Sequence, residues 1–415
     1  MKGSEKSRQS LLDIYLKLKF NESVRYFDCC GIGLIGDFST GTIIGLDDEG
    51  SRFIENRIAD CDYVPVTEKE KELLWQLKIS GFFEELGEGT LSTAYFHVTS
   101  KCNLNCIGCY SDEENRNLRR DLSTDECYKI IDSLKHANVN SLIVSGGEPL
   151  LRNDLADILK YAKNTCEIPM IQVVSNGMID REKYKAILPY IDLLSISVDG
   201  YNEEVNFLRN SNMKYVIDTV KFLSEITSKL CMIFTLHAQN IQYIPKYIAL
   251  SDSLHVPFSF SLLTVKKDIA FSQYYLTEKE YSLLNSIERK YEIPIDEVTN
   301  ENIIGCKNSC GLGKRIISIA SNGEVFPCHM LHDSDLKMGN ILEEEISSIL
   351  GNHCKLWNVN QIKECQKCEF KYLCGGGCYA RRFFNRKDIQ TSHDSCCEIY
   401  KTDISRTLYK LVKGN

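Results

Sequence analysis

From residue 94 to residue 263, short apolar runs alternate with longer segments in which apolar residues recur every three or four positions. Ser123 and Glu126 form a capping box that opens one of the longer segments as a helix. Strands that alternate with amphipathic helices predict a parallel sheet built from βα units, and therefore an α/β fold. The apolar runs predict six strands, at Tyr95–Thr99, Leu142–Ser145, Ile171–Ser175, Leu193–Val198, Met232–Leu236 and Phe258–Leu263.

Residues 1–90 carry a different pattern and are expected to form a separate small unit. Turn signals at Gly36-Asp37 and Thr40-Gly41 predict a hairpin within Val24–Leu46. A short helix is predicted over Gly50–Ile58, and a capping box at Thr67 and Glu70 opens another helix. Strands followed by helices favour a winged-helix-like unit; the alternative is an N-terminal extension that simply packs on the main domain.

The chain after the last predicted strand divides into two parts. Residues 266–302 are polar and helix-prone, and they form a bridge after the 91–265 sheet region. Within 303–415, a turn at Asn322-Gly323-Glu324 separates two apolar runs, Ile316–Ala320 and Val325-Phe326. This pattern predicts a hairpin that leads to Cys328.

Composition and charge narrow the class of protein. Of 415 residues, 43% are hydrophobic and 26% charged, as in globular proteins. The net charge of −8 argues against a nucleic-acid partner, because binding to phosphates needs a basic surface. No apolar run is long enough to span a membrane, and the N-terminus lacks the apolar core of a signal peptide. We therefore expect a cytoplasmic protein without a membrane partner.

The cysteines are concentrated in two regions. Of the 19, three lie between Cys102 and Cys109 and ten between Cys306 and Cys397. In a chain without an export signal, such clustering indicates metal ligands and buried thiols rather than a disulfide framework.

The first region is the segment KCNLNCIGCYS, where Cys102, Cys106 and Cys109 follow a Cys-x3-Cys-x2-Cys spacing directly after a predicted strand. A [4Fe-4S] cluster bound wholly by protein takes four cysteines. Three thiolates in one loop would leave one iron open to a reactant. The alternatives are a zinc knuckle or three unrelated buried thiols.

This segment resembles the signature of the radical S-adenosylmethionine (radical SAM) enzymes. The resemblance implies a partial (β/α)6 barrel, open on one side, with its chemistry at the carboxyl ends of the strands. It also implies that the open iron chelates SAM, whose reductive cleavage yields a 5′-deoxyadenosyl radical. The chain departs from the family at Gly108, where an aromatic residue is usual; its aromatic residue, Tyr110, comes after the third cysteine.

Further motifs lie where the carboxyl ends of the next strands are expected. Two glycines after the second strand allow close approach of a ligand, and the following glutamate supplies an acceptor; this resembles the family's GGEP motif for the SAM amino group. The resemblance implies ribose and carboxylate contacts from the third and fourth strands and a later arginine. Val205 and Asn206 stand where the family usually has a histidine. The expected SAM-binding residues are Gly146, Gly147, Glu148, Ser175, Asn176, Ser195, Ser197, Asp199 and Arg209; no catalytic residue is assigned.

In the second cysteine region, the segment Cys365–Cys378 taken alone also suits a zinc ribbon. The whole pattern, Cys310-x12-Gly323-x4-Cys328, Cys365-x2-Cys368-x5-Cys374-x3-Cys378 and Cys396, resembles the SPASM domain, which binds two auxiliary [4Fe-4S] clusters. The resemblance implies that Cys310, Cys328 and Cys378 are ligands of the first auxiliary cluster, with Cys306 as the fourth ligand. It implies that the ligands of the second auxiliary cluster are Cys365, Cys368, Cys374 and Cys396. Cys397 is the alternative to Cys396 as the last ligand. Cys354 is left over as a buried thiol.

These resemblances imply a peptide maturase with SAM and three [4Fe-4S] clusters. Residues 1–90 resemble the domain that binds a leader peptide by β-augmentation in such enzymes. The implied partners are a cysteine-containing precursor peptide with a leader and an electron donor such as flavodoxin or ferredoxin. The expected product is a thioether crosslink.

Several alternatives stay open at this point. Within the same class they are a carbon–carbon crosslinking maturase and an anaerobic sulfatase maturase, the latter disfavoured because His329 replaces an aspartate after Cys328. Outside it, they are an iron–sulfur electron carrier and a zinc-structured nucleic-acid modifier.

Overall fold

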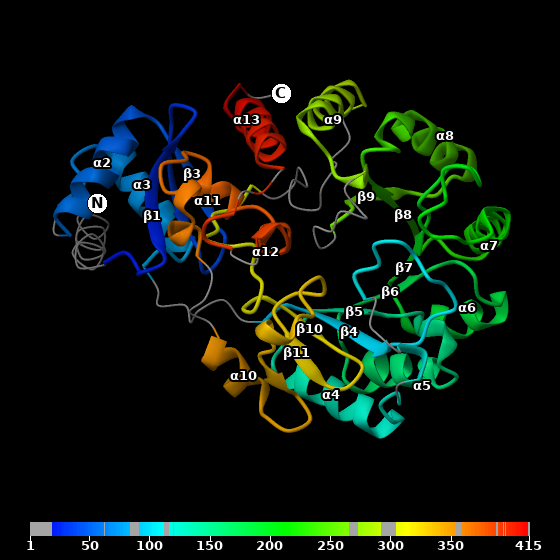
Figure 1. Ribbon diagram of the computed structural model, residues 1–415. Coiled ribbons are helices and arrows are strands. Elements are labelled where there is room, and N and C mark those ends of the chain that lie inside the picture. The colour runs from blue at the N-terminus through cyan, green and yellow to red at the C-terminus, as the bar shows by residue number, and fades with distance from the viewer. Residues whose placement is uncertain are drawn as a thin grey trace.

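The computed structural model describes residues 19–413 except 62, 84–90, 112–115, 119, 265–272, 292–303, 354–357, 387–388, 393 and 395. The element order comprises an N-terminal unit, a large sheet with its helices, and a cysteine-rich C-terminal region (Figure 1). Cys354, which the sequence leaves as a surplus thiol, lies outside the described residues.

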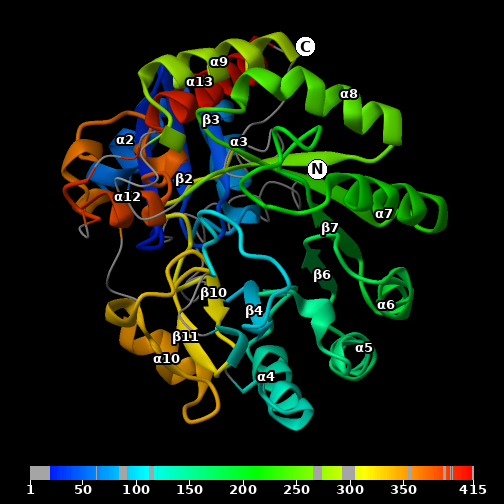
Figure 2. The same ribbon diagram turned by 45° about the vertical axis from the view of Figure 1, so that its right-hand side comes forward.

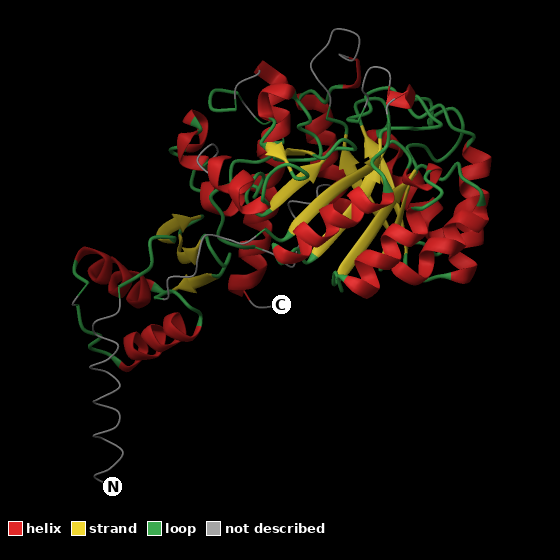
Figure 3. Cartoon of the chain, turned by 90° about the horizontal axis from the view of Figure 1, so that it is seen from below, coloured by secondary structure: helices red, strands yellow, loops and turns green. Residues whose placement is uncertain are grey.

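The large sheet contains all six predicted strands in parallel and in chain order. They are β4 Thr93–Thr99, β5 Ser141–Gly146, β6 Met170–Ser175, β7 Leu193–Ser197, β8 Leu230–Leu236 and β9 Phe258–Leu262. The helices are α4 Thr124–His136, α5 Leu155–Lys160, α6 Arg181–Ile187, α7 Met213–Ile226, α8 Ile244–Leu254 and α9 Glu278–Tyr291. Figure 3 shows helices along the outer face of the curved sheet. The α/β fold class and the partial barrel are therefore confirmed.

The alternation of side chains along each strand decides which residues reach the site. In β5, Leu142 and Val144 are buried in the core between sheet and helices, whereas Ile143 and Ser145 line a cavity on the inner face. Helix α4 buries Ile130 and its apolar neighbours against the same core. The predicted capping box that begins this helix is present in both directions.

The predicted C-terminal hairpin is confirmed as β10 Ile316–Ile319 and β11 Glu324–Phe326. Its position was not predicted: β10 pairs in parallel with β4, so the hairpin extends the barrel sheet. With β12 Gly339–Asn340 the sheet has nine strands in the order β12-β11-β10-β4-β5-β6-β7-β8-β9. The helices of this region are α10 Ile346–His353, α11 Lys371–Cys374, α12 Tyr379–Arg386 and α13 Cys397–Lys413.

The N-terminal unit is a three-stranded antiparallel sheet with two helices. Its strands are β1 Val24–Cys29, β2 Ile32–Asp37 and β3 Ile43–Leu46, with β2 in the centre. The helices are α2 Asp48–Ala59 and α3 Glu68–Ile79. The predicted turn region at 36–41 connects β2 to β3, but the β1–β2 turn was missed. Cys30 and Gly31 form this turn with φ values of 56° and 73°, a conformation for which Gly31 alone is a sequence signal.

The N-terminal unit packs on the cysteine-rich region. Phe27 and Phe38 contact the ring of Tyr372, with ring centroids 5.3 Å and 5.1 Å away. The amide of Cys306 donates to the carbonyl of Gly41 at 2.9 Å. Figures 1 and 2 show the blue sheet beside the orange α11, and α13 beside α9. None of the helices among the described residues has the length and apolar character needed to cross a membrane.

Candidate active site

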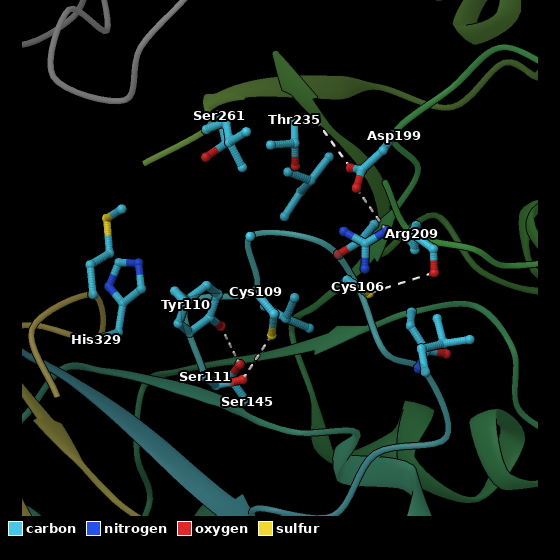
Figure 4. A pocket seen from close by; sticks show the side chains of 18 of the residues that line it. Cys106, Cys109, Tyr110, Ser111, Ser145, Asp199, Arg209, Thr235, Ser261 and His329 are labelled. Atoms are coloured by element: carbon cyan, nitrogen blue, oxygen red, sulfur yellow. Dashed lines mark hydrogen bonds and ion pairs between the residues drawn. The ribbon is translucent and has the colours of Figure 1, made fainter. Parts of the chain in front are cut away.

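A cavity of about 390 Å³ lies inside the barrel at the carboxyl ends of the parallel strands. Figure 4 shows side chains from the cysteine loop, the strand ends and the C-terminal region directed towards it. All three cysteines of the loop line it, together with the following residues that the sequence assigned to SAM: Gly146, Gly147, Ser175, Asn176, Ser197, Asp199 and Arg209. The fold thus brings together at one cavity motifs that are spread over more than a hundred residues of the sequence, from Cys102 to Arg209.

The cysteine loop is held by hydrogen bonds to its own flank. The amide of Cys102 donates to Asn117 Oδ1 at 2.9 Å. The buried guanidinium of Arg116 donates to the carbonyl of Leu104 and approaches the Cys109 Sγ at 3.9 Å. Gly108 has a φ of 73°, so the missing family aromatic coincides with a backbone conformation that favours glycine. Three thiols facing one cavity, with a cation beside them, fit a metal cluster that leaves one metal position open.

The two glycines at the end of β5, Gly146 and Gly147, are required by close backbone packing. A Cβ on Gly146 would lie 2.2 Å from the carbonyl oxygen of Thr99, and one on Gly147 would lie 2.1 Å from that of Lys101. The amide of Gly147 donates to Thr99 at 2.8 Å. The loop is therefore pressed against the start of the cysteine loop, and side chains at these positions would separate the two.

Glu148 lies beneath the cavity rather than in its lining. Its carboxylate accepts hydrogen bonds from the amide of Asn176 at 2.8 Å, the Ser175 hydroxyl at 3.0 Å and the amide of Leu150 at 3.2 Å. Burial raises the pKa of Glu148 to about 7, because no water stabilises its charged form. In this structure Glu148 fixes the loop after β5 to the end of β6.

Asn176 connects the end of β6 to the cysteine loop. Its side-chain amide donates to Asn103 Oδ1 at 2.7 Å and lies 3.9 Å from the Cys102 Sγ. The segment that follows β6 therefore meets the segment that follows β4 at the Cys102 thiol.

Asp199 and Arg209 form a buried ion pair at the opposite wall, with Arg209 Nε 3.0 Å from Asp199 Oδ2. Burial acts to lower the pKa of Arg209, but the charges of Asp199 and Cys106 outweigh it, and the pKa is raised. Ser197 lines the cavity, whereas Ser195 accepts a hydrogen bond from Gln172 at 2.8 Å and is absent from the lining.

Asn206, which stands in the region of the usual family histidine, is buried and bonds to Ser211. Its side chain therefore stabilises the loop between Asp199 and Arg209 rather than contacting the cavity.

An aromatic group that was not predicted from the sequence joins the two cysteine regions. His329 lines the cavity and stacks on Tyr95, with ring centroids 4.1 Å apart, while the ring of Tyr110 lies 5.3 Å away, edge-on. The Tyr110 hydroxyl is 2.9 Å from the Ser145 hydroxyl. Burial lowers the pKa of His329 to about 3, so its imidazole is neutral. The only sequence signals were that Tyr110 follows Cys109 and His329 follows Cys328.

Beyond the hairpin, the structure sorts the remaining cysteines into groups. Cys310, Cys328 and Cys378 pack around one apolar cluster that includes Leu312 and Tyr379. Cys306 is not brought to them: its Sγ lies 2.5 Å from the position of a Cβ on Gly36, and its charged neighbours are Asp37 and Arg25 of the N-terminal sheet.

The adjacent cysteines at the start of α13 point in different directions. Burial raises the pKa of Cys374 to about 12, with further contributions from Asp394 and Cys397. Cys368 is likewise among the charged neighbours of Cys397. Cys396 instead packs in the barrel core, with its Sγ 3.8 Å from the Tyr281 hydroxyl. The structure therefore places Cys397 near Cys368 and Cys374, while Cys374 also packs against the core cluster that contains Cys396.

Two segments of the chain match models of known protein families. Residues 96–250 match the model of the radical SAM superfamily, and residues 310–369 match SPASM, described as an iron-sulfur cluster-binding domain. The chain carries a radical SAM domain and a SPASM domain. The resemblances inferred from Cys102–Cys109 and from the C-terminal cysteines are confirmed at this level.

The relatives of this chain include maturases and peptide cyclases. The chain is 26% identical to mycofactocin maturase MftC of Mycolicibacterium smegmatis over 73% of this chain and 82% of that protein. It is 24% identical to PqqA peptide cyclase of Bradyrhizobium diazoefficiens over 72% and 84%. The structure of Streptococcus suis SuiB bound to S-adenosylmethionine superposes with a TM-score of 0.59 at 16% identity, covering 92% of this chain and all of that one.

A radical SAM domain requires SAM and a [4Fe-4S] cluster, and a SPASM domain binds further iron–sulfur clusters. The described residues fit both. The cavity offers three thiols, narrow backbone loops and a guanidinium. In the SPASM domain, Cys310, Cys328, Cys365 and Cys378 share one apolar cluster, and Cys397 lies near Cys368 and Cys374.

Proposed function

We propose that this radical SAM/SPASM protein matures a ribosomally made precursor peptide and joins a cysteine of that peptide to a carbon through a thioether bond. Its relatives include a maturase and a peptide cyclase by name. SuiB, which shares the fold, has been solved bound to its precursor peptide SuiA, with a TM-score of 0.57. A peptide is therefore the favoured class of substrate.

The cavity residues would bind and orient SAM. The backbone at Gly146 and Gly147 lines the cavity and can meet its amino group, and the Arg209 guanidinium, which also lines the cavity, suits its carboxylate. Asn176 presents an amide beside the cysteine loop. When bound, the cluster supplies the single electron that splits SAM to methionine and a 5′-deoxyadenosyl radical.

The observation that favours a thioether is the position of Cys306. With this thiol turned towards Gly36, the cysteines that the SPASM pattern assigns to the first auxiliary cluster are Cys310, Cys328 and Cys378, one fewer than a fully protein-bound [4Fe-4S] cluster uses. A free position suits a substrate thiolate. Carbon–carbon crosslinking needs no such position.

The overall reaction balances without further reagents beyond an electron acceptor. The substrate carbon loses a hydrogen atom to the 5′-deoxyadenosyl radical, which becomes 5′-deoxyadenosine. The substrate thiol loses its proton to solvent, the C–S bond forms, and one electron leaves. The SPASM domain supplies acceptors suited to that electron.

The N-terminal unit is the proposed binding site for the leader of the peptide. Strand β3 is an edge of its sheet and can accept an added strand. Trp75 and Ile79 lie one turn apart on α3 and are 52% and 62% exposed, so they offer an apolar surface to a peptide.

An electron donor such as flavodoxin or ferredoxin completes the proposed set of partners. All described cysteines are free thiols, which suits the reducing cytoplasm as the site of action.

The test is an anaerobic assay of the cluster-loaded protein with SAM, dithionite and a cysteine-bearing candidate precursor peptide, which is to be sought among the short open reading frames beside its gene. We expect a product that has lost two hydrogens and no longer reacts with iodoacetamide at the crosslinked cysteine. A product with the same mass loss but a reactive thiol would establish carbon–carbon crosslinking instead. SAM cleavage without any change in the peptide would reject this peptide as substrate.

A further inference from the structure

The turn between β1 and β2 brings two adjacent thiols against a carboxylate of the SPASM domain. Cys29, Cys30 and Glu369 each place one potential metal-ligating atom within 4.8 Å of the other two. Cys29 is buried, whereas Cys30 and Glu369 are exposed, so the group sits at the surface where an ion can enter. Neither the lining of the SAM cavity nor the cluster around Cys310 includes these three residues, although Cys29 shares an apolar cluster with Cys368 and Cys374.

Local hydrogen bonds hold the three side chains in this arrangement. Glu369 Oε2 accepts from the amide of Cys30 at 2.7 Å, and among the described residues no hydrogen bond engages Oε1. Cys30 Sγ is 3.6 Å from the Ser405 hydroxyl of α13. The charged neighbours of the Cys29 thiol are Cys30, Glu369 and Asp28. Several groups that carry negative charge when ionised are thus crowded together, and a cation would relieve their repulsion.

We propose that Cys29, Cys30 and Glu369 bind one Zn²⁺ ion, with a water molecule as the fourth ligand. Zinc takes thiolate sulfur at about 2.3 Å and carboxylate oxygen at roughly 2.0–2.2 Å in a tetrahedron, so its ligand atoms lie about 3–4 Å apart. A separation within 4.8 Å meets that requirement after small side-chain adjustments. Two thiolates disfavour the hard cations Mg²⁺ and Ca²⁺. On binding, each thiol releases its proton to solvent.

Such an ion would link the N-terminal sheet, through Cys29 and Cys30, to the SPASM domain, through Glu369. The two regions already touch through Phe27 and Tyr372 and through the hydrogen bond between Cys306 and Gly41. Metal coordination would add a link with defined geometry at the tip of the β1–β2 turn. The inferred role is to fix the N-terminal unit on the SPASM domain, and it holds whether or not the unit binds a leader.

The experiment uses the full chain with its iron–sulfur clusters reconstituted anaerobically. The protein is titrated with ZnCl₂ and desalted, and zinc and iron are measured together by mass spectrometry. We expect one zinc per chain with iron unchanged. Cys30→Ser and Glu369→Gln change exposed side chains, and each should weaken zinc binding at least tenfold while iron content stays the same.

Cys61→Ser is the matched control, because Cys61 is another exposed thiol of the same N-terminal unit. It should bind zinc as the unchanged protein does. Hydrogen exchange supplies a second measurement: zinc should slow exchange in residues 24–37 of the unchanged protein and of Cys61→Ser, but not of Glu369→Gln. Equal zinc content in the unchanged protein and in a Cys30→Ser/Glu369→Gln double variant would overturn the proposal. So would zinc that enters only as iron is lost.

Discussion

The cysteine loop of the radical SAM domain and the cysteines of the SPASM domain differ in how the fold brings their thiols together to bind iron–sulfur clusters. In the first, Cys102, Cys106 and Cys109 come from one short loop that is stabilised by its own flank. In the second, the thiols come from segments far apart in sequence, and packing decides which of them meet. Spacing alone therefore predicts which thiols lie together in the first case, where all three line one cavity, but not in the second.

The largest effect is expected from the loop. Changing Cys102, Cys106 and Cys109 together to Ala should abolish 5′-deoxyadenosine formation and remove about four irons per chain, because one cubane cluster loses all its thiolates. Binding of the precursor peptide should persist. SAM cleavage, iron content and peptide binding are measured on the same preparation; surviving SAM cleavage would contradict the assignment of this loop.

The pair Cys310 and Cys306 tests the comparison in the SPASM domain. Cys310→Ala should cost about four irons, whereas Cys306→Ala should leave iron content near that of the unchanged protein, because Cys306 packs on Gly36 rather than on the other thiols. Iron and sulfide analysis gives the result. An equal loss in both variants would restore Cys306 as a ligand and remove the open position on which the thioether proposal rests.

Cys397 and Cys396 provide a second matched pair, one residue apart. Cys397→Ala should lose about four irons, and Cys396→Ala should keep them, because Cys397 neighbours Cys368 while Cys396 packs beside Tyr281. Iron analysis, supported by electron paramagnetic resonance of the reduced protein, distinguishes the two. The opposite order would show that the spacing pattern, which assigned Cys396, outweighs the packing.

A smaller effect is expected at the N-terminal unit. Trp75→Asp should weaken leader-peptide binding at least tenfold, which corresponds to about 1.4 kcal/mol, because it places a charge on the exposed apolar face of α3. Leu411→Asp is the control, since Leu411 is 68% exposed on α13. Fluorescence anisotropy of a labelled leader measures both; equal affinities would leave the unit as a structural extension.

The smallest effect concerns Glu148. Because burial raises its folded-state pKa to about 7, above the ordinary value, its contribution to stability is present at acidic pH and is lost as the pH rises through 7. Between pH 6 and 8 this loss should be about 1 kcal/mol. Glu148→Gln should flatten this dependence in anaerobic denaturant unfolding, whereas the exposed Glu182→Gln should not. If the free energy of unfolding depended on pH in the same way in the unchanged protein and in Glu148→Gln, the predicted role of Glu148 would be wrong.

The barrel was predictable because each βα unit carries its own local pattern. The capping box at Ser123 and the apolar run Leu142–Ser145 specify a helix and a strand whatever lies elsewhere in the chain. The order of motifs along parallel strands then places them at one edge, as found for Ser175 and Asp199.

The details that escaped prediction depend on contacts distant in sequence. Whether Cys306 joins Cys310 is decided by Gly36, which belongs to another domain. Successive residues at a helix start point about 100° apart, so Cys396 and Cys397 face different surroundings. Ser195 and Ser197 share one strand face, yet only their depth in the barrel decides which one lines the cavity.

The pairing of β10 with both β4 and β11 sets a distance. Ser318 of β10 stands opposite Tyr95 of β4 on one side and Phe326 of β11 on the other. Two strand separations, about 10 Å, therefore divide the strand that leads into Cys102 from the strand that leads into Cys328. Because β11 runs antiparallel to β4, this spacing separates the two strands and not the cysteines that follow them. Backbone hydrogen bonds within a single sheet nevertheless hold one cysteine region relative to the other, so an electron passing between them would need no rearrangement of domains.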